Sequence, residues 1–227
     1  MRKQGEEDND SDDDVGENAE LRLLLVDTNC FLRIYHSDLR PFLGADVGGY
    51  RIRTLISLLR EVEDSNRLAH EYAWVRDDLM DEARNGTLNP LARADQEEIA
   101  EEIKALRRYA NWLLDKHCTA HGMVARTLSG RDLELLATAA QFGAVIASDE
   151  WALGFVVADL ISDEEANYAI EIVTSMEVLS ILERAGKLSA DARRATVVSW
   201  LRTEEKLPRD WQERYRALFD EAPPQIQ

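Results

Sequence analysis

The sequence predicts an α/β fold: a three-layer α/β/α sandwich around a mainly parallel sheet, with additional C-terminal helices. Two short apolar runs, Leu23–Val26 and residues 143–148, are each followed directly by a carboxylate, Asp27 and Asp149. Continuous apolar runs of this length are typical of strands buried on both faces of a parallel sheet. Amphipathic segments lie between the predicted strands, and an alternation of strands with helices indicates a layered α/β fold.

The first half of the chain begins with a strongly acidic segment. Residues 1–20 hold nine acidic and two basic side chains. Such a segment buries too little apolar surface to offset chain entropy, so we expect a disordered acidic tail. After the first strand, amphipathic patterns predict helices over residues 50–64 and 74–85, with a weaker strand candidate at 67–72.

The second half of the chain is mostly helical in pattern. We expect a long helix over about 94–117, because its apolar residues recur on one stripe. These are Ile99, Ile103, Leu106, Ala110 and Leu113. A further helix at 131–142 leads into the second strand, and residues 168–173 alternate like a strand. Three more amphipathic segments predict helices over residues 175–186, 189–201 and 208–219.

These elements predict one folded body with extensions. After the tail at 1–20, we expect a domain over residues 21–165 with a helical insertion at about 87–128. The C-terminal strand and helices, residues 166–227, are expected to pack on the same domain.

Composition narrows the functional classes. No apolar run approaches the roughly 18 residues of a membrane helix, and two cysteines provide no disulfide framework, so we expect a cytoplasmic protein without a membrane partner. The tail contributes −7 of the formal net charge of −17, which leaves −10 for the rest. A carboxylate cluster filled with divalent cations becomes locally electropositive, so the acidic balance does not exclude a nucleic-acid substrate.

Three aspartates are predicted to meet at one edge of the sheet. Asp27 and Asp149 follow strands directly, and ligands of open α/β sheets bind beyond the carboxyl ends of the strands. Asp132 begins the helix that leads into the second strand, which places it near the same edge. Carboxylates about 4 Å apart repel by roughly 4 kcal/mol at an effective dielectric near 20. Because these are oxygen ligands without histidine or thiolate, they favour Mg²⁺ or Mn²⁺.

Three segments that carry these aspartates resemble the PIN-domain nuclease family, in the family's order. Residues 24–29 (LLVDTN) resemble its opening strand with the first catalytic aspartate. Residues 129–139 (SGRDLELLATA) resemble its third acidic position, and 143–153 (GAVIASDEWAL) its fourth. The resemblance covers residues 21–160, and 173–188 resemble more loosely the end of VapC-like toxin ribonucleases from bacterial toxin–antitoxin pairs.

The resemblance implies a metal-dependent endoribonuclease that hydrolyses RNA phosphodiesters. Its implied metal ligands are Asp27, Asp132 and Asp149, which bind Mg²⁺ or Mn²⁺. The second acidic position has two candidates: Asp78 matches the family's spacing but stands where glutamate is expected, and Glu82, which we favour, lies four residues later on the same helical face.

Polar neighbours and protein partners are implied as well. Thr28, Asn29 and Ser148 are placed to orient the carboxylates by hydrogen bonds. The resemblance also implies a small inhibitor protein (antitoxin), and the insertion could form a lid, a substrate surface or a homodimer contact.

Other interpretations of the same residues remain open. Each aspartate also fits a turn or a helix cap. A PIN-like scaffold with an incomplete acidic set would act as a binding module, and an aspartyl phosphatase would need an aspartate where Asn29 stands. Arg33 and the pairs Arg107–Arg108 and Arg193–Arg194 are expected mostly on solvated helix faces.

Overall fold

The computed structural model describes residues 21–57, 61, 78, 88–89, 93–162 and 168–226. The acidic segment 1–20, the strand candidate at 67–72 and, apart from Asp78, the helix predicted over 74–85 lie outside the described residues. Among the helices that are described, none combines the length and apolar character that a membrane span requires.

A mainly parallel sheet forms the centre of the described structure. Its strands are β1 (Arg22–Val26), β2 (Asp46–Val47), β3 (Tyr50–Leu55), β4 (Leu88–Asn89), β5 (Val145–Ala147) and β6 (Glu171–Val173). β1 lies between β3 and β5, and β6 follows β5, all in parallel. On the other edge of β3, its first residues pair antiparallel with β2 and its last pair parallel with β4. The predicted α/β class with a mainly parallel sheet is confirmed.

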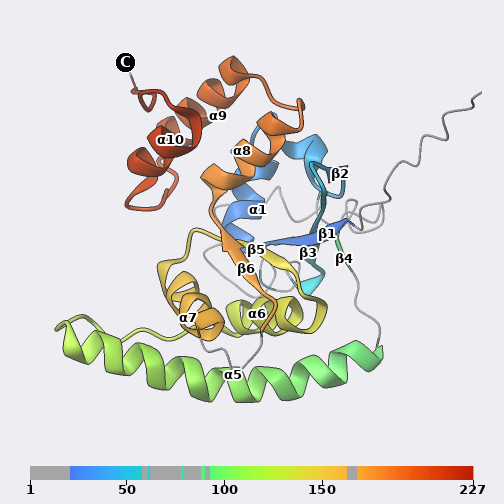
Figure 1. Ribbon diagram of the computed structural model, residues 1–227, viewed down its shortest axis with the longest axis vertical. Helices are drawn as coiled ribbons and strands as arrows, with labels where there is room; N and C mark the ends of the chain where they lie inside the picture. Colours follow the sequence, from blue (N-terminus) through green and yellow to red (C-terminus); the bar gives the residue numbers. More distant parts are fainter. Residues whose placement is uncertain are drawn as a thin grey trace, which may run out of the picture.

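Helices cover both faces of this sheet (Figure 1). The described helices are α1 (Thr28–Tyr35), a 3-10 turn (Arg40–Phe42), α5 (Arg93–Ala120), α6 (Gly130–Phe142), α7 (Trp151–Ser162), α8 (Ser175–Arg184), α9 (Ala190–Arg202) and α10 (Trp211–Phe219). In Figure 1, α5, α6 and α7 lie below the sheet, and α1 lies above it with the three C-terminal helices. The arrangement is compatible with the predicted three-layer sandwich.

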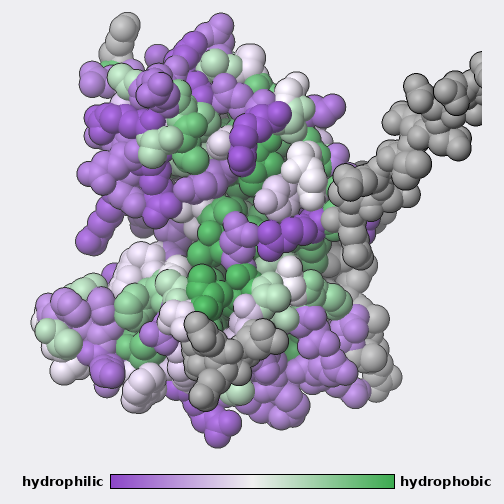
Figure 2. Space-filling view, viewed as in Figure 1, coloured by the Kyte–Doolittle hydropathy of each residue, from purple (hydrophilic) through white to green (hydrophobic). Residues whose placement is uncertain are grey.

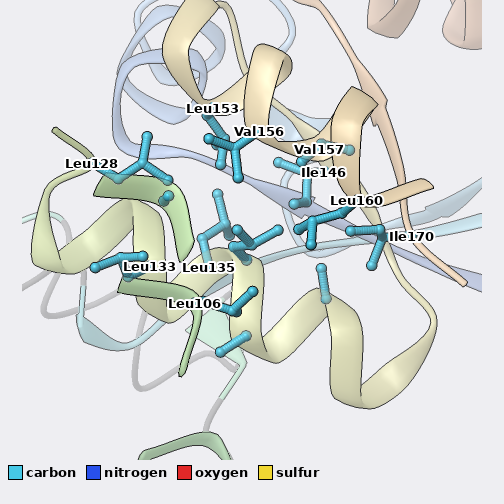
Figure 3. Packing of buried hydrophobic residues seen from close by; sticks show 14 of the residues in the cluster. Leu106, Leu128, Leu133, Leu135, Ile146, Leu153, Val156, Val157, Leu160 and Ile170 are labelled. Atoms are coloured by element: carbon cyan, nitrogen blue, oxygen red, sulfur yellow. The ribbon is translucent and has the colours of Figure 1, made fainter. Parts of the chain in front are cut away.

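The alternation of side chains along β1 produces two cores. Leu24 and Val26 belong to an apolar cluster with α1 and α8–α10, whereas Leu25 belongs to a second cluster with α5–α7. Figure 3 shows the second cluster, where Ile146 of β5 lies beside Val157 and Leu160 of α7. Because the C-terminal helices share their core with β1, residues from both ends of the described chain build one body.

The helix predicted over residues 50–64 is wrong in its first part, since residues 50–55 form strand β3. Gly48 and Gly49 both have positive φ, at 59° and 82°, and join β2 to β3 by the two-residue turn that hairpins favour. In β3, Arg51 is exposed and Ile52 is buried, which is the period of a strand. The apolar residues of this segment fit the period of a helix as well as that of a strand, so only the glycine pair indicated the strand.

The other predicted elements within the described residues are confirmed with shifted ends. The long helix α5 extends over Arg93–Ala120, and α6, α8, α9 and α10 lie where amphipathic patterns predicted them. Arg193 was expected on a solvated helix face, and this expectation is wrong. Its side chain is buried between Glu183 and Glu221, at 2.6 Å from each carboxylate, and these ion pairs join α9 to α8 and to the segment after α10.

Candidate metal-binding pocket

A small pocket lies at the carboxyl end of β1. The residues that line it come from the carboxyl ends of β1 and β3 and from the beginning of α6. The lining residues are Val26, Asp27, Thr28, Thr54, Leu55, Ser57, Arg131, Asp132 and Leu135. Its volume is about 30 Å³, which is room for an ion or one or two water molecules rather than for a nucleotide. Two of the three predicted aspartates, Asp27 and Asp132, therefore face one small space.

Asp27 is held rigidly at the junction between β1 and α1. One carboxylate oxygen accepts a hydrogen bond of 2.6 Å from the backbone N–H of Cys30, so Asp27 is the N-cap of α1. The other oxygen accepts a bond of 2.5 Å from the hydroxyl of Ser148, which follows β5. No cationic side chain among the described residues pairs with it. Asp27 is thus a buried, oriented carboxylate whose charge is not neutralised by these residues.

The environment of Asp27 raises the pKa of its carboxyl from 3.8 to about 6. Burial is the main cause, because it removes water from the charged form. The hydrogen bonds from Ser148 and Cys30 lower this pKa, and the negative charge of Asp149 raises it. A cation bound beside Asp27 would favour the ionised form and oppose the effect of burial.

Asp149 is also at a strand end, but a cation of the chain already neutralises it. Its carboxylate pairs with the guanidinium of Arg33, and the side chain of Arg33 is only 2% exposed. Ser175 donates two further hydrogen bonds to Asp149, from its backbone N–H at 2.9 Å and its hydroxyl at 2.7 Å. The expectation that Arg33 lies on a solvated face is wrong: α1 directs it into the core, where it also packs 5.5 Å from the ring of Trp200.

Asp132 has two roles available to it. It is the third residue of α6, where its carboxylate accepts a bond of 2.8 Å from the backbone N–H of Ser129. The hydroxyl of Ser129 accepts a bond of 3.1 Å from the N–H of Asp132 in return, which completes a capping box. The helix-cap interpretation of this residue is therefore correct, and the same cap fixes its carboxylate at the rim of the pocket.

The described residues do not complete the predicted acidic set. Glu82 lies outside the described residues. Asp78 does not line the pocket and lies 3.8 Å from the guanidinium of Arg40, with about half of its side chain exposed. Within the described ranges, no group of three or more histidine, cysteine, aspartate or glutamate side chains lies close enough to hold a metal.

Several residues at the pocket were not singled out from the sequence. Thr54 donates a hydrogen bond of 2.9 Å to the carbonyl of Val26 and joins the ends of β3 and β1.

Thr28, predicted to orient a carboxylate, donates its hydroxyl to Glu61, and Asn29 is exposed. Arg131 also lines the pocket, and its guanidinium pairs with Glu134 at 2.8 Å. Its position beside Asp132 was the signal that could have identified it.

These donors fit a hard divalent cation. Mg²⁺ commonly binds proteins through one or two carboxylates while it keeps several waters, and Asp27 and Asp132 supply two carboxylates to one ion-sized space. Asp27 also accepts hydrogen bonds that hold its orientation, as ligands of metals usually do. No protein-family model, no curated protein and no solved structure matches this chain.

Proposed function

We propose that this chain is a divalent-metal-dependent ribonuclease of the PIN-domain kind, with Mg²⁺ or Mn²⁺ held by Asp27 and Asp132. The observation that carries the proposal is Asp27 itself. It is buried at the carboxyl end of a parallel strand, has no cationic partner among the described residues and shares an ion-sized pocket with a second carboxylate. Perturbed carboxylates in such pockets are characteristic of functional sites.

The chain's own groups have separable tasks in this proposal. Ser148 and the Cys30 N–H hold Asp27 in one orientation, and the Ser129 cap does the same for Asp132. A bound divalent ion supplies activation of water and stabilisation of negative charge on the phosphate. Arg131 also lines the pocket, but its guanidinium pairs with Glu134 at 2.8 Å, so contact with a phosphate oxygen would need Glu134 to release it.

Asp149 has a supporting place in the proposal. Because its charge raises the pKa of Asp27, it lies within electrostatic reach of the pocket. Its hydrogen bonds to Arg33 and Ser175 join the ends of β5 and β6 to α1. Asp149 therefore fixes the frame that carries Asp27, and ligation by Asp149 would need Arg33 to release it.

A second candidate function is a PIN-like scaffold that works as a binding module without catalysis. The pairing of Asp149 with Arg33 favours it, because one of the three predicted ligands is already neutralised. Titration with Mn²⁺ separates the two candidates, since a scaffold without a competent pocket shows no saturable binding. An inhibitor protein and a homodimer are further proposals that rest on the sequence resemblance alone.

Incubation of the purified protein with single-stranded RNA and Mn²⁺ tests the ribonuclease. We expect cleavage that EDTA abolishes and that Asp27→Asn and Asp132→Asn each reduce by at least about 100-fold, the scale of losing one electrostatic partner of a transition state. Asp191→Asn, which removes an exposed carboxylate of α9, is the matched control and should cleave like the wild type. Equal cleavage by all preparations would identify a contaminating nuclease and refute the proposal.

A further inference from the structure

A second, larger groove lies at the other end of the sheet, where β1 and β3 begin. Its volume is about 490 Å³, which is within the range of sites that hold a ligand. The described residues that line it are Leu21, Arg22, Leu23, Arg51, Arg53, Phe142 and Gly143. Three of these seven are arginines and none is acidic, in a chain whose formal net charge is −17. We call these seven residues the arginine groove.

The pairing of the strands brings the arginines together. Arg51 and Arg53 are two residues apart on β3, so their side chains leave the same face of the sheet. Arg51 is paired in register with Leu23 of β1, which follows Arg22. Phe142, at the end of α6, adds a ring that is 44% exposed. Figure 2 shows a row of hydrophilic residues at the height of β1 on this face, with hydrophobic surface directly below it.

The acidic neighbours of the groove do not balance its arginines. Glu171 pairs with Arg22 at 2.8 Å. Asp46 serves two guanidiniums, at 3.1 Å from Arg53 and at 3.6 Å from Arg51. Within the described part of the chain, three cations therefore share two carboxylates.

Arg51 and Arg53 differ in how many of their donors are used. The guanidinium of Arg53 donates to the carbonyls of Gly44 and Ala45 and to Asp46, and its side chain is only 19% exposed. Arg51 donates no hydrogen bond to a described residue, and its side chain is 52% exposed. Because a guanidinium has five N–H donors, Arg51 is the part of the groove that can bind a further anion.

The acidic N-terminal segment joins the described structure at this groove. Leu21, which lines the groove, directly follows residues 1–20. Seven of the nine residues 6–14 are acidic and none is basic. The seven residues from position 14 to position 21 span at most about 25 Å, so the acidic run is long enough to return to the groove.

We propose that the acidic run, residues 6–14, binds in the arginine groove of its own chain, with a carboxylate at the guanidinium of Arg51. Hydrogen bonds between arginine and a carboxylate are strengthened by charge and have a matching geometry. Exposed ion pairs are individually weak, but a short tether raises the effective concentration of the segment at the groove to roughly the millimolar range. A weak contact is therefore enough to keep the groove occupied.

Tethering favours the chain's own segment over other anions. A free phosphate or nucleotide competes only at a concentration that approaches the effective concentration of the segment. The same limit applies to the acidic run of a second copy. Since the two sites share no residue and lie at opposite ends of β1, an occupied groove leaves the Asp27–Asp132 pocket open.

A fluorescent peptide of residues 1–20, added to full-length chains at low salt, tests the groove by anisotropy. In a tail-neutral variant, the seven acidic residues of the run are changed to their amides. We expect this variant to bind the peptide at least about five-fold more tightly than the wild type, whose own segment competes. Arg51→Gln in the tail-neutral chain should weaken this binding by a similar factor. Arg202→Gln, which removes an exposed arginine of α9, is the matched control and should not.

Equal affinity of the peptide for the wild type and the tail-neutral variant would overturn the inference. Peptide binding that Arg51→Gln leaves unchanged, or no binding to the tail-neutral variant, would overturn it as well. A wild-type dimer in sedimentation that the tail-neutral variant does not form would place the segment in the groove of a second copy and refute binding within one chain. Absence of Mn²⁺ binding would refute the proposed function and leave this inference standing, because the pocket and the groove have no residue in common.

Discussion

Two aspartates stand beyond the ends of neighbouring strands and have different environments. Asp27 follows β1 directly, Asp149 follows β5 after Ser148, and the two strands are parallel neighbours. Asp149 is paired with the buried guanidinium of Arg33, whereas Asp27 receives only neutral donors, Ser148 and a backbone N–H. The carboxylate of Asp149 is used to hold the fold together, whereas that of Asp27 keeps a negative charge available in a pocket.

The difference teaches that a position at a strand end is not enough to identify a ligand. Burial penalises both charges, and the decisive feature is whether the chain itself supplies the compensating cation. Arg33 supplies this cation to Asp149, whereas none of the described residues supplies one to Asp27. Substitutions at the two positions should therefore change the stability of the metal-free protein in opposite directions.

Asp149→Asn should give the largest effect. Removal of this charge leaves the guanidinium of Arg33 buried, with Glu205 at 3.8 Å as its remaining acidic neighbour. We expect the free energy of unfolding in urea to fall by about 3–5 kcal/mol, the usual result when one partner of a buried ion pair is removed. Asp191→Asn, which removes one of the two acidic partners of the exposed Arg194, should leave it nearly unchanged. A variant as stable as the wild type would contradict a structural role for Asp149.

Asp27→Asn should stabilise the metal-free protein near neutral pH. Because folding raises the pKa of Asp27 from 3.8 to about 6, the folded state binds the proton more tightly, and stability is lost as pH rises through this window. The loss amounts to about 3 kcal/mol at about 1.4 kcal/mol per pH unit. Asparagine does not titrate, so the advantage of the variant in urea unfolding should be nearly absent at about pH 4 and complete at about pH 7. An advantage that is independent of pH would show that burial of the charge is not its source.

Ser129→Ala should give the smallest effect and separates the cap from the pocket. It removes the hydroxyl that accepts from the N–H of Asp132, and we expect a loss of about 1 kcal/mol in thermal unfolding. Ser189→Ala removes the corresponding N-cap of α9 and should cost a similar amount. Mn²⁺ affinity should be the same in both variants, because the backbone N–H of residue 129, which donates to the carboxylate of Asp132, is kept in Ser129→Ala. Weaker Mn²⁺ binding by Ser129→Ala alone would show that the carboxylate depends on the hydroxyl as well.

Much of the fold could be predicted from local patterns. The apolar runs before Asp27 and Asp149 specified the two central strands, and the stripe of Ile99, Leu106 and Ala110 specified the long helix. The segment at 50–55 could not be assigned by periodicity, because Ile52 and Leu55 satisfy a helical spacing as well as burial in a strand. The Gly48–Gly49 turn, a local signal, resolves it.

The candidate site was only partly predictable for a physical reason. The predicted strand ends and the order of the elements placed Asp27 and Asp132 at one edge of the sheet. In the structure both residues line the same pocket. The pairing of Asp149 with Arg33 joins residues 116 positions apart, and whether an arginine points inward depends on how α1 packs against Trp200. A buried ion pair of this kind has no periodic signal along the chain.

Calorimetric titration of Mn²⁺ into the wild type, Asp27→Asn and Asp132→Asn tests the central claim most directly. The account predicts saturable binding to the wild type that weakens by at least about ten-fold in each variant, since each removes one of two carboxylate ligands. Binding of equal affinity to all three proteins, or none to the wild type, would contradict it.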